Sequence, residues 1–374
     1  MDVTLSRRGL PLTVGSAKLT VCRTFQAIKE LYAGPPTEEN STMTTRNSLI
    51  RRLACASLLV SVAATTQFVT SVYAQGAGGR SVTQGLAKKT IDNLYKCPVE
   101  VANHRISAVG TITSLDGKTW TVPAETAFQT GPKGSDLYND CTGVTPSKTS
   151  EVSTANVAVT VLDADGEVIT GYIVADNYFE FYVNGKLIAV DPGPFTPFNS
   201  VVVKFKAKRP ITYAFKVVDW EEDLGLGTET NFGNKSRYYQ GDGGLIARFS
   251  DGTVTDSTWK AQSFYIAPLK SPDDVVEKGN EHDTTKLGRI HPRAPKPGCE
   301  EKCFAVHYPI PANWATPTFD DSKWPRAYEY TDEDIGVTSV KGYTNFPELF
   351  EGSRWIWSLN LVFDNLILAR KTVR

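Results

Sequence analysis

The segment Asp219–Gly227 holds the densest group of side chains in this sequence that could do chemistry. It reads Asp-Trp-Glu-Glu-Asp-Leu-Gly-Leu-Gly, so four carboxylates surround one indole at the end of a predicted strand. Hydrolysis of a glycosidic bond needs two carboxylates that face each other across the sugar, roughly 5–10 Å apart. Neighbours on one loop seldom reach that arrangement. We therefore expect these carboxylates to hydrogen-bond sugar hydroxyls, to bind a structural Ca²⁺, or to form a solvated acidic loop.

The loop that follows adds aromatic rings and flexible glycines. Tyr238-Tyr239-Gln240-Gly241-Asp242 combines residue types that line carbohydrate sites, and Trp220, Tyr238 or Tyr239 would offer a ring face for stacking. Asp242 is the carboxylate that this loop could fold back toward Trp220. We assign no catalytic residue and no metal ligand. The candidate ligand-binding residues are Trp220, Glu221, Glu222, Asp223, Tyr238, Tyr239 and Asp242.

Familiar catalytic motifs do not occur elsewhere in the sequence. It contains no Gly-x-Ser-x-Gly elbow, no phosphate-binding loop and no Gly-x-Gly-x-x-Gly after a predicted strand. The four histidines lack metal-ligand spacing. Asp163-Ala164-Asp165-Gly166 lacks the third oxygen position and the closing Glu of a calcium loop, so we predict a turn there.

The N-terminal part of the chain reads as an export signal. Arginines precede an apolar run over residues 53–69, and Val72-Tyr73-Ala74 places small residues at a cleavage site before Gln75. We predict a signal peptide over residues 43–74 and a secreted, extracellular protein. Residues 1–42 are then a dispensable extension upstream of a start at Met43. An uncleaved signal anchor that leaves residues 1–52 in the cytoplasm is the alternative.

The charge composition of residues 75–374 argues against nucleic acid as a partner. Residues 75–374 contain 32 Lys and Arg against 37 Asp and Glu, without a block of like charge, so a nucleic-acid footprint is not indicated. No second apolar run is long enough to span a membrane. Asn234-Lys235-Ser236 is a candidate N-glycosylation site, which would lie on the surface.

The four cysteines after the predicted signal agree with export. An even number in a secreted protein suggests two disulfides, for which three connectivities exist. We favour Cys97–Cys141 and Cys299–Cys303, because each bond would fix a segment rich in Gly, Pro and Asp. A zinc site at Cys299, Cys303 and His307 is the alternative, and a fourth ligand for it is not evident.

The pattern of hydrophobic residues predicts an almost entirely β protein. Asn184-Gly185 is typical of a type I′ hairpin turn, and it divides the apolar segment Tyr178–Val190 into two strands. A short amphipathic helix is expected around residues 86–95, and residues 268–318 are expected to form a long irregular loop. Other predicted strands cover 156–162 and 167–174, which flank the turn at 163–166, and 201–207, 212–220, 244–249 and 259–266.

Four segments together resemble the sugar-binding modules of β-galactosidase-type and α-L-rhamnosidase-type glycoside hydrolases. They are Ala-Asp-Asn-Tyr through Asn-Gly-Lys at 175–186, Asp-Gly-Thr through Trp-Lys at 251–260, and Phe-Asp-Asp-Ser-Lys-Trp at 319–324. The fourth, at the C-terminal end of this chain, runs from Trp-Ile-Trp at 355–357 to residues 365–370 and resembles an edge strand of those modules. The resemblance implies a galactose-binding-like fold, an antiparallel jelly-roll β-sandwich over residues 151–374. Residues 75–150 would pack on it as an extension. Trp259 and Trp324 are expected to pack in its core.

Two departures from those modules limit what the resemblance implies. Here Trp-Ile-Trp follows the Asn-Gly hairpin, whereas in the glycosidases it precedes the hairpin. Those modules also accompany a catalytic barrel, for which this chain leaves no room. The leading expectation is therefore a secreted, non-enzymatic, lectin-like protein that binds carbohydrate. The alternatives are an extracellular structural or matrix protein, and a glycan-active hydrolase or lyase with an unrecognised site.

Overall fold

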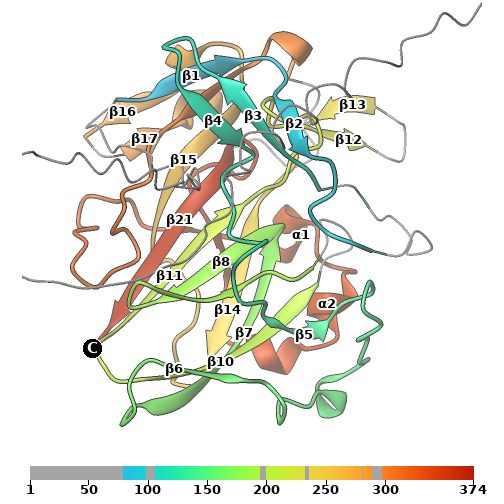
Figure 1. Cartoon of the computed structure of the whole chain (residues 1–374), viewed down its shortest axis with the longest axis vertical. Helices are drawn as coiled ribbons and strands as arrows, with labels where there is room; N and C mark the ends of the chain where they lie inside the picture. Colours follow the sequence, from blue (N-terminus) through green and yellow to red (C-terminus); the bar gives the residue numbers. More distant parts are fainter. Residues whose placement is uncertain are drawn as a thin grey trace, which may run out of the picture. The chain divides into compact units, whose positions relative to one another are not determined.

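Short strands rich in aromatic and β-branched residues build two seven-stranded sheets in the computed structural model of the protein (Figure 1). The structure describes residues 79–97, 105, 107–193, 199–231, 236–279, 281–288 and 297–374. The predicted extension, the predicted signal peptide and Asn234 lie outside these residues.

The first sheet has the order β1-β18-β15-β21-β11-β8-β9. Its strands are β1 (Ser81–Gln84), β18 (Phe304–His307), β15 (Lys260–Leu269), β21 (Asp364–Val373), β11 (Ile211–Val218), β8 (Tyr178–Val183) and β9 (Lys186–Val190). The second sheet has the order β19-β20-β14-β7-β10-β5, and β6 also pairs with β10. Its strands are β19 (Tyr328–Tyr330), β20 (Trp355–Trp357), β14 (Gly244–Phe249), β7 (Glu167–Asp176), β10 (Ser200–Ala207), β5 (Ser135–Tyr138) and β6 (Val159–Val161).

Three small sheets and several single helical turns complete the described structure. The small sheets are β2 (Lys88–Ile91) with β3 (Val109–Thr113) and β4 (Thr119–Val122), β12 (Glu229–Asn231) with β13 (Ser236–Tyr239), and β16 (Val276–Lys278) with β17 (Glu281–Asp283). The α-helical turns are α1 (Asp332–Ile335) and α2 (Lys341–Thr344). The 3₁₀ turns are η1 (Thr149–Glu151), η2 (Pro272–Asp274), η3 (Thr285–Leu287), η4 (Glu300–Lys302) and η5 (Pro347–Phe350). Within the described ranges, no helix has the length and apolar character needed to cross a membrane.

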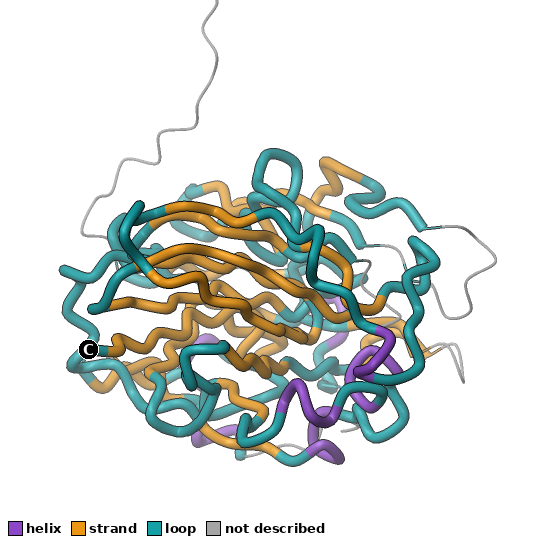
Figure 2. The backbone as a smooth tube through the Cα atoms, turned by 90° about the horizontal axis from the view of Figure 1, so that it is seen from below, coloured by secondary structure: helices purple, strands orange, loops and turns teal. Residues whose placement is uncertain are grey.

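The two large sheets pack face to face through buried aromatic rings. Phe181 of β8 stacks on Phe249 of β14 with ring centroids 5.4 Å apart, and it lies 5.9 Å from Phe205 of β10. Tyr213 of β11 lies 4.6 Å from Phe249. These rings alternate along their strands with residues on the opposite face, as a two-layered core requires. Figure 2 shows the strands in stacked layers. The protein is thus an all-β antiparallel sandwich, as predicted, and the jelly-roll connectivity stays a prediction.

The predicted hairpin is confirmed in position and in turn geometry. β8 and β9 pair antiparallel on either side of Asn184-Gly185. The φ angles of Asn184 and Gly185 are 50° and 84°, the two positive values that this turn demands. The tryptophans expected in the core are also buried, with Trp259 0% and Trp324 5% exposed.

The segment before the predicted turn at 163–166 pairs differently from the prediction. β6 does not form a hairpin with β7. It runs parallel to β10, and β7 lies antiparallel on the other side of β10. The N–H groups of Leu162 and Asp163 both donate to the Lys206 carbonyl, at 2.9 and 3.2 Å. The end of β10 therefore lies between two strands that are adjacent in sequence, a long-range pairing that a local turn signal does not reveal.

Three other predictions about elements are wrong. Residues 86–95 contain strand β2 rather than a helix, and the expected irregular loop at 268–318 contains β18, which lies between β1 and β15 in the first sheet. The segment resembling a C-terminal edge strand supplies β21, which lies between β15 and β11 in the interior of that sheet. β18 is four residues long within a segment rich in Pro and charge, so its sequence carries little periodicity.

Both favoured cysteine pairs lie at disulfide distance. Cys97 is joined to Cys141, and Cys299 to Cys303, each with Cα atoms 4.9 Å apart. The second bond closes η4 immediately before β18, and Cys303 is fully buried. The disulfide therefore fixes the position at which β18 begins.

Candidate functional site

The predicted stacking residue Trp220 lies inside the protein. Its side chain is 1% exposed and meets the rings of Tyr95 and Tyr178 edge to face, with centroids 6.2 and 5.5 Å away. The backbone N–H of Trp220 donates to the Asn177 side-chain oxygen at 3.0 Å. Trp220 thus packs in the core at the end of β11, and it offers no exposed ring to a sugar. This corrects the expectation of a stacking platform at this position.

Glu221 fixes the turn that follows Trp220. Its carboxylate accepts the backbone N–H of Gly225 at 2.8 Å, the N–H of Gly227, and the hydroxyl of Tyr265 at 2.7 Å. Gly225 and Gly227 have φ of 93° and 62°, so glycines permit the backbone to wrap around this carboxylate. Burial raises the pKa of Glu221 to about 7, although these hydrogen bonds oppose the increase.

The other predicted residues form a polar network beside that turn. Asp223 is buried and accepts the Tyr238 N–H at 3.4 Å, while the Tyr238 hydroxyl donates to Glu301 at 2.7 Å. Glu222 accepts the Thr230 N–H at 2.6 Å. The structure therefore brings Glu222, Asp223 and Tyr238 into one region, where their side chains bind backbone N–H groups and Glu301.

Tyr239 and Asp242 belong to the same region and are both half-buried. Tyr239 pairs with Glu229 across β12 and β13. The charge of Asp242 contributes to raising the pKa of Asp176 and of Asp219. The dominant cause in each case is burial. Together with Glu229 and the guanidinium of Arg105, they form what we call the acid cluster: Arg105, Asp176, Asp219, Glu229 and Asp242.

An exposed pocket of about 380 Å³ lies elsewhere on the sandwich. Its lining residues are Ser257, Pro325, Arg326, Ala327, Tyr328 and Glu329. Tyr328 is 38% exposed, and Ser257, Arg326 and Glu329 are exposed as well. In the part of the chain that the structure describes, no hydrogen bond or ion pair engages the Arg326 guanidinium. We call this feature the Tyr328 pocket.

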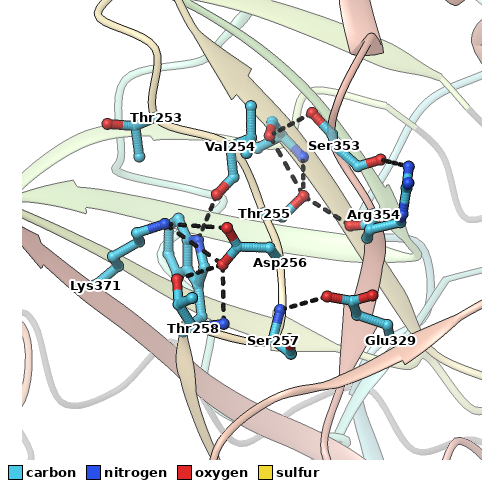
Figure 3. Close-up of polar contacts among 12 residues, drawn as sticks. Thr253, Val254, Thr255, Asp256, Ser257, Thr258, Glu329, Ser353, Arg354 and Lys371 are labelled. Atoms are coloured by element: carbon cyan, nitrogen blue, oxygen red, sulfur yellow. Dashed lines mark hydrogen bonds and ion pairs between the residues drawn. The ribbon is translucent and has the colours of Figure 1, made fainter.

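The Tyr328 pocket forms where separate sequence motifs meet. The Ala327 N–H donates to the Trp259 carbonyl at 2.9 Å. Glu329 accepts the Ser257 N–H at 2.8 Å (Figure 3). Residues 325–329 are thereby joined to the segment 251–260. On the other side, Tyr328 pairs with Trp357 of β20. The pocket thus lies between segments that resemble three of the sugar-module motifs.

Paired groups in the segment 254–259 hold the Ser257 side of the pocket in place. The Thr255 hydroxyl donates to the Arg354 carbonyl at 2.8 Å, and Asp256 pairs with Lys371 at 3.3 Å (Figure 3). The Trp259 indole N–H donates to the Val254 carbonyl at 2.7 Å. The polar and aromatic side chains that line the pocket itself are those of Ser257, Arg326, Tyr328 and Glu329.

Little in the sequence indicates the Tyr328 pocket. Its one local signal is that residues 325–329 follow directly after Phe-Asp-Asp-Ser-Lys-Trp, with Tyr and Glu alternating as in a strand at a sheet edge. The contact with Ser257 joins residues 72 positions apart. Such contacts depend on the tertiary fold.

The described residues contain no group of three or more His, Cys, Asp or Glu placed to hold a metal ion. The Tyr328 pocket can bind a ligand through an apolar ring face, a fixed positive charge and hydrogen-bonding oxygens. Comparisons with protein-family models, curated proteins and solved structures find no match to this chain. The fold and the site define an antiparallel β-sandwich protein with a shallow, aromatic and polar pocket.

Proposed function

We propose that this protein is a secreted, non-catalytic, lectin-like protein that binds carbohydrate in the Tyr328 pocket. The observation that carries the proposal is the exposure of Tyr328 beside Arg326 and Glu329. Sugars have an apolar face of C–H groups and a rim of hydroxyls. An aromatic ring next to charged hydrogen-bonding groups matches both parts.

The position of the pocket supports the same proposal. The four segments that resemble sugar-binding modules are dispersed through the sequence, yet three of them border the Tyr328 pocket. Tyr328 and Glu329 lie on β19, the edge strand of the second sheet, and are held by the β20 backbone. The backbone that carries these two side chains is therefore already ordered before a ligand binds, which limits the entropic cost.

Secretion is part of the proposal and rests on separate observations. Two cysteine pairs at disulfide distance are typical of proteins that fold in an oxidising compartment. The sequence before Gln75 has the order of an export signal.

The test is a glycan array followed by calorimetric titration of the best ligand. We expect Tyr328→Ala to weaken binding by about tenfold, because an aromatic contact contributes about 0.5–1.5 kcal/mol. Arg326→Ala should also weaken it. Leu115→Ala, at a position 74% exposed in the β3–β4 turn, is the matched control and should bind as wild type does. A folded wild type that binds no glycan, or a Tyr328→Ala variant with full affinity, would contradict the proposal.

The same experiment distinguishes the lectin-like protein from a matrix protein that uses the sandwich for protein contacts. Such a protein would retain its partner in Tyr328→Ala and would show no glycan binding. Turnover of a glycan by the wild type would instead favour the hydrolase or lyase.

A further inference from the structure

Two basic residues lie opposite each other where the Tyr328 pocket meets the first sheet. Lys260, the first residue of β15, forms an isolated antiparallel bridge with Arg326, which lines the pocket. Backbone hydrogen bonds flank the bridge on both sides, from the Ala327 N–H to the Trp259 carbonyl at 2.9 Å and from the Ala261 N–H to the Pro325 carbonyl at 3.1 Å. Lys260 and Arg326 are therefore a non-hydrogen-bonded pair, the arrangement in which opposed side chains approach more closely.

Positive charges in this arrangement repel each other. Side chains of a directly opposed pair leave the sheet on the same face, with Cβ atoms about 4.5–5.5 Å apart, and like charges at such positions are destabilising. Arg370 of β21 is the register partner of Lys260 on its other side. Three basic side chains therefore form one cross-strand row, which we call the cationic row: Arg326, Lys260 and Arg370.

The buried end of the cationic row has a carboxylate partner. Arg370 is 1% exposed, and its Nε lies 3.4 Å from Asp321. Lys260 donates instead to a neutral acceptor, the Trp324 carbonyl, at 2.8 Å. Within the described residues, no carboxylate lies at ion-pair distance from Lys260 or from Arg326. The charge at the pocket end of the row is therefore uncompensated there.

The carboxylate of the pocket itself is engaged elsewhere. Glu329 accepts the Ser257 N–H at 2.8 Å (Figure 3) and forms no ion pair with Arg326. Glu329 thus acts as a hydrogen-bond acceptor at this position, which suits a sugar hydroxyl, and it leaves the guanidinium to another anion.

The guanidinium lies beside the aromatic ring of the pocket. Arg326 and Tyr328 are both exposed and line the pocket, whereas Ala327 between them is 4% exposed. Side chains alternate along an extended chain, so Arg326 and Tyr328 leave it on the same side. A sugar that stacks on Tyr328 therefore has the guanidinium at its rim.

We propose that the Tyr328 pocket takes acidic carbohydrate, in which the sugar carries a carboxylate or a sulfate group, and that Arg326 binds this group. The inference rests on the function proposed above and names the class of its ligand. A guanidinium can donate two parallel hydrogen bonds to such an oxyanion, and hydrogen bonds between charged partners are the stronger ones. Lys260 contributes a second positive charge, and the bound anion offsets the repulsion between the two cations.

A glycan array with matched pairs of ligands tests the proposal. It contains oligogalacturonides and sulfated galactan oligomers, each beside the neutral counterpart made by carboxyl reduction or by desulfation. The first pair measures recognition of a carboxylate, and the second measures recognition of a sulfate. Calorimetric titration then gives the acid preference, which is the ratio of the affinities for the acidic and the neutral member of a pair. At about 0.15 M salt, which screens charges more than about 8 Å apart, we expect an acid preference of about tenfold or more for at least one pair.

Variants of the two cations assign the preference to the pocket. Arg326→Gln should reduce the acid preference to near one, and Arg326→Lys, which keeps the charge without the planar guanidinium, should retain part of it. The second variant also serves if the first does not fold. Lys260→Gln should reduce the preference by about threefold, because its charge lies next to Arg326. Lys208→Gln is the matched control, since it removes an exposed cation that pairs with Asp165 and does not line the pocket, and it should keep the wild-type preference.

The failure of this inference can be distinguished from failure of the proposed function. A wild type that binds the neutral members as tightly as the acidic ones would overturn the inference and leave the lectin-like function standing. An acid preference that persists in Arg326→Gln, or that falls as far in Lys208→Gln, would also overturn it, because the anion would then be recognised outside the Tyr328 pocket. A folded wild type that binds no member of the array would contradict the proposed function, and the inference with it.

Discussion

At the scale of single residues, the carboxylates after β11 show how neighbours in sequence acquire different roles. Glu221 points into the turn and accepts two backbone N–H groups and a tyrosine hydroxyl, whereas Glu222 faces Arg105 and the β12 backbone. From the sequence, these carboxylates were expected to bind sugar hydroxyls or Ca²⁺ or to form a solvated acidic loop. The sequence did not reveal that Glu221 and Asp223 are buried, because a buried network and an exposed site use the same types of side chain.

Replacing Trp220 tests that structural role. Trp220→Ala removes a side chain that is 1% exposed between two tyrosine rings, so we expect a loss of about 3–5 kcal/mol in the free energy of unfolding. Urea denaturation measures it. Leu115→Ala should change that free energy by no more than about 0.5 kcal/mol. A Trp220→Ala variant as stable as the wild type would show that the indole is not a core residue.

At the scale of elements, local signals were sufficient where the chain pairs with its own neighbour. Asn184-Gly185 defines β8 and β9, because two positive φ angles can be read from the residue types. β6 and β18 could not be assigned in this way. β6 pairs with β10, and β18 pairs with β1 and β15. These long-range pairings depend on the tertiary fold.

The turn between β8 and β9 provides a test of an element. Gly185 has φ of 84°, and a Cβ there would lie 2.9 Å from Thr316 Cγ2. We therefore expect Gly185→Val to reduce the free energy of unfolding by about 1–3 kcal/mol. Gly79→Val is the control, because nothing lies within 4 Å of its Cβ position. Equal melting temperatures for wild type and Gly185→Val would refute the assignment of this turn.

The two disulfides, one of which precedes β18, lead to a second prediction at this scale. Both cysteine pairs after the predicted signal lie at bonding distance, so the secreted, unreduced protein should contain no free thiol. Thiol titration in denaturant measures this, and a sample reduced beforehand supplies the positive control. Two or more reactive thiols per secreted chain would show that at least one bond does not form.

At the scale of the whole molecule, the sandwich brings together segments that the sequence keeps apart. The strand order of the second sheet places β19 beside β20, and the loop before β15 reaches β19 through Ser257 and Glu329. The class of fold could be predicted from strand patterns, and the resemblance marked the segments involved. The pocket itself could not be predicted, because it forms where the loop before β15 meets β19, and that contact depends on the tertiary fold.

The composition of the pocket leads to the last prediction, which is binding without turnover. Hydrolysis of a glycoside needs an acid and a second carboxylate roughly 5–10 Å apart. The residues that line the Tyr328 pocket include one carboxylate, Glu329, and the nearby Asp256 is paired with Lys371. We therefore expect the wild type to bind its glycan without cleaving it, and Glu329→Gln to weaken binding alone. Product analysis with aryl glycosides and polysaccharides measures turnover, and Glu221→Gln controls for the carboxylate in the buried turn. Cleavage by the wild type that disappears in Glu329→Gln would instead identify a catalytic pocket.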